Sequence, residues 1–281
     1  MRKLSWRWQA AYQSGFAAVA LFVLAPLWGL VYLAVDGGLK GWPVEFRLWP
    51  ERPTPAVFVE MWHKSAQTLS FLGLLKNSLL VAGGAAVLSV AFGAGMAYAF
   101  ARFRFPGRRA GLFGLLVGTL LPPVALMTPL YVLLTALGLR TTLQGLAIVY
   151  TAFSMPFCIW NMRAGFQSVS KELEESAFLD GATHLDAFWR ITLPLALPSI
   201  AIAALIAFLL GYSEFAIGWL FVATGKNVTL GMALAGMLTS SLGSWSRMAA
   251  LALMTSAPVV VIFLVLQEYL LNGLLIGNDE R

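Results

Sequence analysis

Long apolar stretches without a charged residue recur along the chain, and they set the expected architecture. A bilayer core about 30 Å thick needs about 20 apolar residues in helical conformation. Six stretches of that size contain no Asp, Glu, Lys or Arg: residues 14–35, 77–101, 110–139, 141–162, 191–213 and 248–267. The pattern therefore predicts an all-α membrane protein with six transmembrane helices.

Two uncharged stretches depart from a simple spanning helix. Residues 110–139 contain three prolines, Pro122, Pro123 and Pro129. Because proline removes a backbone N–H and clashes with the preceding turn, we expect one kinked span near residues 112–134. A seventh stretch, 227–246, is rich in Gly, Ser and Thr, which suits a lipid-facing helix poorly. We expect it to form an interfacial or re-entrant element that faces protein or water.

Basic residues gather in two segments, and they predict the orientation. The tail 1–13 carries Arg2, Lys3 and Arg7, and the connection after the second span carries Arg102, Arg104, Arg108 and Arg109. An excess of Lys and Arg marks cytoplasmic loops, so both segments are expected inside. Six spans then return the C-terminal tail, 273–281, to the same side. The transmembrane domain, 14–272, would have an external loop at 36–70 and its largest cytoplasmic loop at 163–190.

Composition agrees with a membrane protein and excludes several other classes. The 281 residues are 59% apolar and 11% charged, with a mean hydropathy of +0.78, too little charge for the surface of a soluble enzyme. The excess of 19 Lys and Arg over 13 Asp and Glu therefore informs on topology, and no nucleic-acid partner is expected. The single cysteine, Cys158, lies in an apolar run and is expected to be a small buried residue.

The loop 163–190 has the pattern of two short helices joined at a glycine. Glu172, Glu174 and Glu175 lie in the first turns of the first helix, where the positive end of the helix dipole favours carboxylates. Gly181 is expected to end that helix in a left-handed conformation. Thr183, three residues before Asp186, then begins the second helix with a capping-box pattern. We expect the second helix to end before Pro194.

The residues alone leave two roles open for this helix pair. A rigid helix-glycine-helix unit that protrudes from a six-span protein can insert into a groove of a cytoplasmic partner. An amphipathic hairpin of the same sequence can also lie on the lipid surface.

A spaced motif in this loop resembles the Glu-Ala-Ala signature of ATP-binding-cassette importer permeases. Glu175-Ser176-Ala177 is followed after three residues by Gly181, then by Ile191 and by Leu193-Pro194. The departure is Ser176, where the family usually has alanine. The resemblance implies that the loop is a coupling helix docked on an ATPase subunit. Its interface residues would be Glu174, Glu175, Ser176, Ala177, Asp180, Gly181, Ala182, Leu193 and Pro194.

Similar segments elsewhere extend the resemblance over most of the chain. They include Asn77-Ser78, Tyr98 to Arg102, Pro129-Leu130-Tyr131, and Gln267 with Asn272 to Leu274. They look like the carbohydrate-uptake branch, and the last is similar to the tail of the second permease subunit of maltose-type transporters. The resemblance implies a prokaryotic inner-membrane importer of a sugar, such as a di- or oligosaccharide related to the α-glucosides. It also implies three partners: a sister permease, an ATPase dimer and an external solute-binding protein.

Catalysis is not expected of this chain. No Gly-x-x-x-x-Gly-Lys-Ser/Thr phosphate loop is present, and Gly225-Lys226 is followed by Asn227. ATP and Mg²⁺ would be used by the partner ATPase, with no cofactor bound here. His63 and His184 have no metal-ligand spacing around them, so we expect no metal site.

Four polar residues within or beside apolar runs are candidates for the translocation pathway. Glu214 is an acidic residue inside an apolar segment, which resembles a Trp-Asn-Glu-Phe segment of sugar permeases. A charge in hydrocarbon costs at least about 2.5 kcal/mol, so Glu214 must face the bundle interior, a watery cavity or a partner. Two roles remain open for Glu214. It could contact the sugar or help to gate the pathway, or it could form a structural hydrogen bond between helices, which we call a polar staple. Tyr150, Asn161 and Tyr212 could also line a sugar path.

A secondary transporter that works without ATP is the main alternative. That class predicts inverted repeats and several intramembrane ionisable groups, neither of which is visible in the sequence. A membrane assembly or anchoring subunit is a third possibility.

Overall fold

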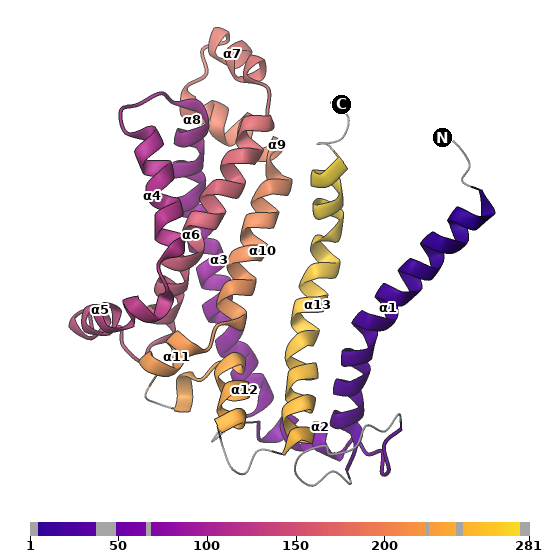
Figure 1. Cartoon of the computed structure of the whole chain (residues 1–281). Coiled ribbons are helices and arrows are strands. Elements are labelled where there is room, and N and C mark those ends of the chain that lie inside the picture. The colour runs from indigo at the N-terminus through magenta and orange to yellow at the C-terminus, as the bar shows by residue number, and fades with distance from the viewer. Residues whose placement is uncertain (1–4, 38–48, 66–68, 223–224, 240–243, 276–281) are drawn as a thin grey trace.

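The computed structural model describes residues 5–37, 49–65, 69–222, 225–239 and 244–275, and its elements in these ranges are all helices (Figure 1). Four of them are long and apolar enough to cross a membrane: α1 (Trp6–Val35), α3 (Phe71–Arg102), α6 (Leu143–Ser168) and α13 (Trp245–Leu275). They correspond to the first, second, fourth and sixth expected spans.

The remaining two expected spans are broken helix pairs. α4 (Arg108–Leu120) and α5 (Pro123–Ala136) meet at an angle of 98°, and the helical run His184–Leu195 meets α10 (Leu197–Ser213) at 77°. Counting each pair as one span gives up to six among the described residues. We expected one continuous, kinked helix at 112–134, and this prediction is wrong, because the segment forms two separate helices. The consecutive prolines Pro122 and Pro123 end one helix and begin the next instead of bending a continuous one.

Helix boundaries differ from the expected ones mainly at the chain ends. α1 begins at Trp6, so much of the expected tail 1–13 is helical, and α13 continues to Leu275, past the expected start of the tail 273–281. The expected external loop 36–70 contains α2 (Ala56–His63), while its residues 38–48 and 66–68 lie outside the described part. The last part of α1 packs against the beginning of α13, and both of these helix ends lie near α2, whereas the first half of α1 diverges from the bundle (Figure 1).

Three short helices lie at the end of the bundle opposite α7: α2, α11 (Ala216–Phe221) and α12 (Leu230–Thr239) (Figure 1). Ten helical residues rise about 15 Å, so α12 is too short to cross the bilayer. Two side chains in the first third of α3 bind the backbone of the segment that leads into α12. Asn77 Nδ2 donates to the Val228 carbonyl at 2.8 Å, and Ser78 Oγ accepts from the Leu230 amide at 2.8 Å. Within the stretch 227–246, which is expected to face protein or water, α12 packs on α3 and α13, and residues 240–243 lie outside the described part.

The core lies where α3, α6 and α10 pack against one another. Small residues allow the close approach: a Cβ on Gly84 would meet Ala147 at 3.3 Å, and one on Gly211 would meet the Ala82 backbone at 3.3 Å. Such small-residue contacts are typical of helices that associate in membranes. Ser89 and Ser154 also share a hydrogen bond of 2.7 Å in this interface. The bundle therefore gives the loop between α6 and α10 a rigid base.

Candidate functional site

The loop after α6 forms the expected first helix, α7 (Lys171–Leu179). Ser170 caps its first turn, because the Ser170 hydroxyl accepts a hydrogen bond of 3.2 Å from the Glu172 amide. Glu172 and Glu174 lie in that first turn, where carboxylates are favoured by the helix dipole. The local sequence signals therefore favour a helix that begins at this position.

The turn after α7 has the expected left-handed glycine. Gly181 has φ +87°, its amide donates to the Phe178 carbonyl at 3.1 Å, and the Ala182 amide donates to the Ala177 carbonyl at 3.0 Å. This pair of hydrogen bonds defines a Schellman motif, which satisfies the last carbonyls of the helix. The prediction for Gly181 is confirmed.

The second helix, α8 (His184–Ala187), begins with the expected capping box. The Asp186 amide donates to the Thr183 hydroxyl at 3.2 Å, and the Thr183 amide donates back to the Asp186 carboxylate at 3.0 Å. Two backbone donors are thereby satisfied reciprocally. The capping box therefore defines where the second helix begins.

The expected end of this second helix before Pro194 is wrong. The helical run continues as the π-helix Phe188–Thr192 and then as α9 (Leu193–Leu195), with Pro194 inside it. The Leu193 amide bonds the Phe188 carbonyl, five residues back. A wider π turn directly before the proline lets the chain stay helical where a normal turn would meet the proline ring.

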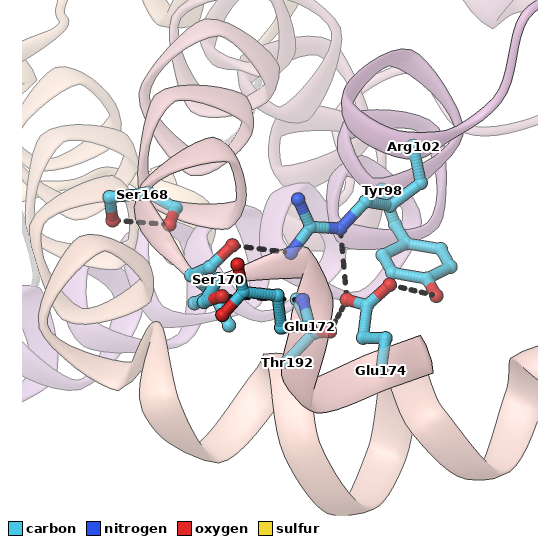
Figure 2. Close-up of polar contacts among 9 residues, drawn as sticks. Tyr98, Arg102, Ser168, Ser170, Glu172, Glu174 and Thr192 are labelled. Carbon is cyan, nitrogen blue, oxygen red and sulfur yellow. Dashed lines mark hydrogen bonds and ion pairs between the residues drawn. The ribbon is translucent and has the colours of Figure 1, made fainter. Parts of the chain in front are cut away.

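A buried ion pair fastens α7 to the end of α3. Arg102 Nε donates to Glu174 Oε1 at 2.9 Å, and the side chains of both residues are only 6% exposed. Arg102 Nη2 also donates to the Val169 carbonyl at 2.8 Å, while the Thr192 hydroxyl donates to the same Glu174 oxygen. The Tyr98 hydroxyl lies 3.4 Å from the other carboxylate oxygen. Figure 2 shows the Glu174 carboxylate between Arg102, Tyr98 and Thr192.

Glu174 therefore does not lie on the open face of the loop, and its expected place at a partner interface is corrected. Neighbouring positions on a helix point about 100° apart, so the inward turn of Glu174 places Glu175 outward. Both Glu175 and Ser176 are exposed, and Leu179 is 91% exposed. Of the other expected interface residues, Asp180, Gly181 and Pro194 are exposed, while Ala177, Ala182 and Leu193 are partly buried.

Aromatic contacts complete the underside of the loop. The imidazole of His184 packs edge-on between Phe178, at 4.7 Å between ring centroids, and Phe103, at 5.2 Å. Phe188 packs against Tyr98 at 4.9 Å. The loop is thus attached to α3 through both aromatic contacts and an ion pair.

The pathway candidates form one pair and two separate residues. The Tyr150 hydroxyl on α6 donates to Glu214 Oε2 at 2.6 Å. Glu214 lies one residue beyond α10, at the break before α11, and its carboxylate accepts from the Ile217 amide at 2.9 Å. Tyr212 faces away and donates to the Thr255 carbonyl at 2.9 Å on α13. Asn161 lies near the other end of α6, with Oδ1 buried.

The sequence analysis did not predict that Arg102 pairs with Glu174. It placed Arg102 in the basic cluster that sets orientation and in the Tyr98 to Arg102 segment of the family resemblance. A signal was present in the spacing, because Tyr98 and Arg102 are four residues apart and share one face of a helix. Within the described part of the chain, no three His, Cys, Asp or Glu side chains come together as a metal site would require.

Comparison with known proteins adds family information to this geometry. A model of the family "Binding-protein-dependent transport system inner membrane component" matches residues 89–275. The trehalose transport system permease protein of Mycobacterium tuberculosis (strain CDC 1551 / Oshkosh) is 34% identical over 209 residues, 74% of this chain and 76% of that protein. The maltose/maltodextrin transport system permease protein of Escherichia coli (strain K12) is 33% identical over 209 residues, 73% of this chain and 71% of that protein.

A solved structure shares the fold along nearly the whole length. It belongs to a bacterial ABC transporter involved in the import of the acidic polysaccharide alginate, and it matches with a TM-score of 0.75. The match covers 96% of this chain and 99% of that chain at 23% sequence identity. At this identity the likeness shows the fold alone.

Proposed function

Because the chain belongs to the family of binding-protein-dependent transport system inner membrane components, we propose that it is a permease subunit of an ATP-driven sugar importer. It is a multi-pass membrane protein, and its relatives are permease subunits rather than enzymes. The observation that carries the proposal is the family match over residues 89–275, which includes the whole helix-glycine-helix loop.

The proposed substrate class rests on two relatives that are more than 30% identical to this chain. They are permeases for trehalose and for maltose or maltodextrin, and both match over about three quarters of this chain. Both sugars are α-linked glucosides. A di- or oligosaccharide of the α-glucoside class is therefore the proposed cargo.

The proposed coupling element is the loop of α7 and α8, docked on an ATPase subunit that binds ATP and Mg²⁺. Its outer face carries Glu175, Ser176 and the exposed Leu179, a polar and apolar mixture that suits a protein groove better than water. The Arg102–Glu174 pair supports this role, because a lever must be fixed to the bundle that it moves. The sister permease and the external binding protein complete the proposed complex.

The proposed orientation places α7 in the cytoplasm with both chain ends on the same side. The beginning of α1 and the end of α13 lie at the α7 end of the bundle (Figure 1). The arginine-rich connection between α3 and α4 also lies there, as expected for a cytoplasmic loop.

The test is uptake by the purified complex. The full-length chain carrying an affinity tag would be isolated from its own membranes with the proteins that accompany it and reconstituted in vesicles with the binding protein. Uptake of radiolabelled trehalose or maltose should require ATP on the α7 side, and a phosphate-loop lysine variant of the ATPase should abolish it. Uptake driven by an ion gradient without ATP would instead identify a secondary transporter.

A further inference from the structure

A cavity lined by arginines opens beside the connection between α3 and α4. It has a volume of about 730 Å³, and Arg104, Arg108, Arg109 and Arg163 contribute to its wall together with Phe105 and Leu112. Three of the arginines come from the α3–α4 connection and the start of α4, and Arg163 comes from α6. Positive charge from two separate elements of the chain therefore converges on one hollow.

Among the residues that the structure describes, no ion pair balances the charges of this cavity. No acidic residue lines the cavity, and the ion pairs between described residues involve Arg102, Arg190 and Arg247 instead. Arg163 is held in place, because its Nε lies 3.4 Å from the Phe100 carbonyl and its guanidinium lies 5.5 Å from the Trp160 ring. Four like charges in one hollow repel each other, so an anion that binds between them is stabilised.

The backbone adds further donors on the same side. α4 begins at Arg108 after Gly107, which has φ +82°, and no side chain caps the first turn. The Arg108 amide already donates to the Phe105 carbonyl at 3.3 Å. The next two amides of the first turn, those of Arg109 and Ala110, point along the helix axis and favour an anion. Oxygens of a phosphate group match both the guanidinium groups and these amides.

An exposed apolar surface continues from the cavity along α4. None of the residues of this helix is buried, and Phe113, Leu116, Val117 and Leu120 are exposed large hydrophobic residues. From Arg108 to Leu120 the helix rises about 18 Å, close to the thickness of one leaflet of a 30 Å bilayer core. Figure 1 shows α4 extending from the α7 end toward the middle of the bundle.

We propose that the arginine cavity binds the phosphate headgroup of an anionic phospholipid, with its acyl chains along the exposed face of α4. The order of the features matches such a molecule, because positive charge lies at the membrane surface and an apolar surface leads inward from it. A free phosphate has the same headgroup chemistry, but it has no use for the apolar face of α4. The proposal does not depend on which sugar is transported.

The test measures lipid selectivity of the full-length chain purified in detergent. An equimolar mixture of dioleoyl phosphatidylglycerol and dioleoyl phosphatidylcholine is added, and the retained lipids are counted by native mass spectrometry. The test variant is Arg108→Gln/Arg109→Gln. The matched control, Lys171→Gln/Arg190→Gln, removes two exposed basic charges from the same end of the molecule but not from the cavity. Gel filtration checks that each variant remains folded.

The wild-type chain and the control should retain phosphatidylglycerol preferentially, and the cavity variant should lose about fivefold in selectivity for each arginine removed. Equal losses in both variants would mean a diffuse positive surface and would overturn the proposal. Millimolar inorganic phosphate or glycerol phosphate should displace little lipid, because neither reaches the exposed apolar face of α4. If either displaces the lipid completely, the cavity is a site for free phosphate and the lipid proposal is wrong.

Discussion

Arg102 Nε lies 2.9 Å from Glu174 Oε1 and joins the last residue of α3 to α7, 72 residues later in the chain. Both side chains are almost fully buried, and further hydrogen bonds from Thr192 and to Val169 satisfy parts of the pair. A buried ion pair of this kind is costly to break on one side only, because the remaining charge is left without compensation. The attachment of the loop therefore depends on both residues.

The first prediction concerns this ion pair. Glu174→Gln should destabilise the loop by about 3–5 kcal/mol, because it leaves the buried Arg102 guanidinium without a counter-charge. The neighbouring Glu175→Gln should change stability by less than about 0.5 kcal/mol, because Glu175 is exposed. Limited proteolysis of α7 and the thermal unfolding midpoint of the purified chain measure the difference.

A double variant separates charge from packing. Arg102→Met/Glu174→Leu replaces the pair by apolar side chains and should recover much of the stability that Glu174→Gln loses, since no unpaired charge remains. If Glu174→Gln and Glu175→Gln unfold at the same temperature, the ion pair does not anchor the loop.

Local sequence signals predict the loop well. The glycine at position 181 and the Thr183–Asp186 capping box act within one or two turns, so they can be recognised without knowledge of the rest of the fold. The same holds for the apolar stretches that became α1, α3, α6 and α13.

Features that depend on distant contacts could not be predicted in the same way. The partner of Glu174 is 72 residues away, and the partner of Glu214 is 64 residues away. The prolines at 122 and 123 indicate an interruption, but not the angle of 98° between α4 and α5 or the contact between α5 and α11. The pattern of apolar and polar residues predicts where the helices lie along the chain. Which side chains pair between the helices depends on how the helices pack, and this pattern does not show the packing.

The second prediction tests whether Glu214 and Tyr150 act as one staple. Tyr150→Phe and Glu214→Gln should each destabilise the chain, and the double variant should cost less than their sum by about 0.5–3 kcal/mol because the partners are in contact. Thermal unfolding of the four proteins gives this coupling energy. Additive losses would show that the hydrogen bond contributes nothing to stability.

Transport assays decide whether Glu214 also belongs to the pathway. Glu214→Gln keeps the side-chain volume but removes the charge. Loss of sugar uptake with normal amounts of assembled complex would indicate a pathway role. Normal uptake with normal assembly would show that the charge is dispensable.

The third prediction concerns topology. In a Cys158→Ala background, a cysteine at position 108 should react with a membrane-impermeant maleimide only after the membrane is permeabilised. A cysteine at position 52, on the opposite end of the molecule, should react in intact cells. The reverse pattern of labelling would place α7 outside and contradict the proposed coupling to an internal ATPase.

The fourth prediction concerns the turn in the coupling loop. Gly181→Val should strain the backbone, because a β-branched residue is disfavoured at φ +87° and a left-handed conformation costs about 1–2 kcal/mol for residues other than glycine. Gly181→Asn should be tolerated better, since asparagine visits this region more readily. Both variants should insert their helices normally, because the bundle packing does not involve this turn.

The central claim is that this loop couples the permease to ATP hydrolysis, and sugar-stimulated ATPase activity of the reconstituted complex tests it most directly. Wild-type complex should hydrolyse ATP faster when trehalose or maltose and the binding protein are present. The Gly181→Val complex, assembled in normal amounts, should lose both this stimulation and sugar uptake. Wild-type rates of stimulated hydrolysis and uptake in the Gly181→Val complex would contradict the coupling role of the loop.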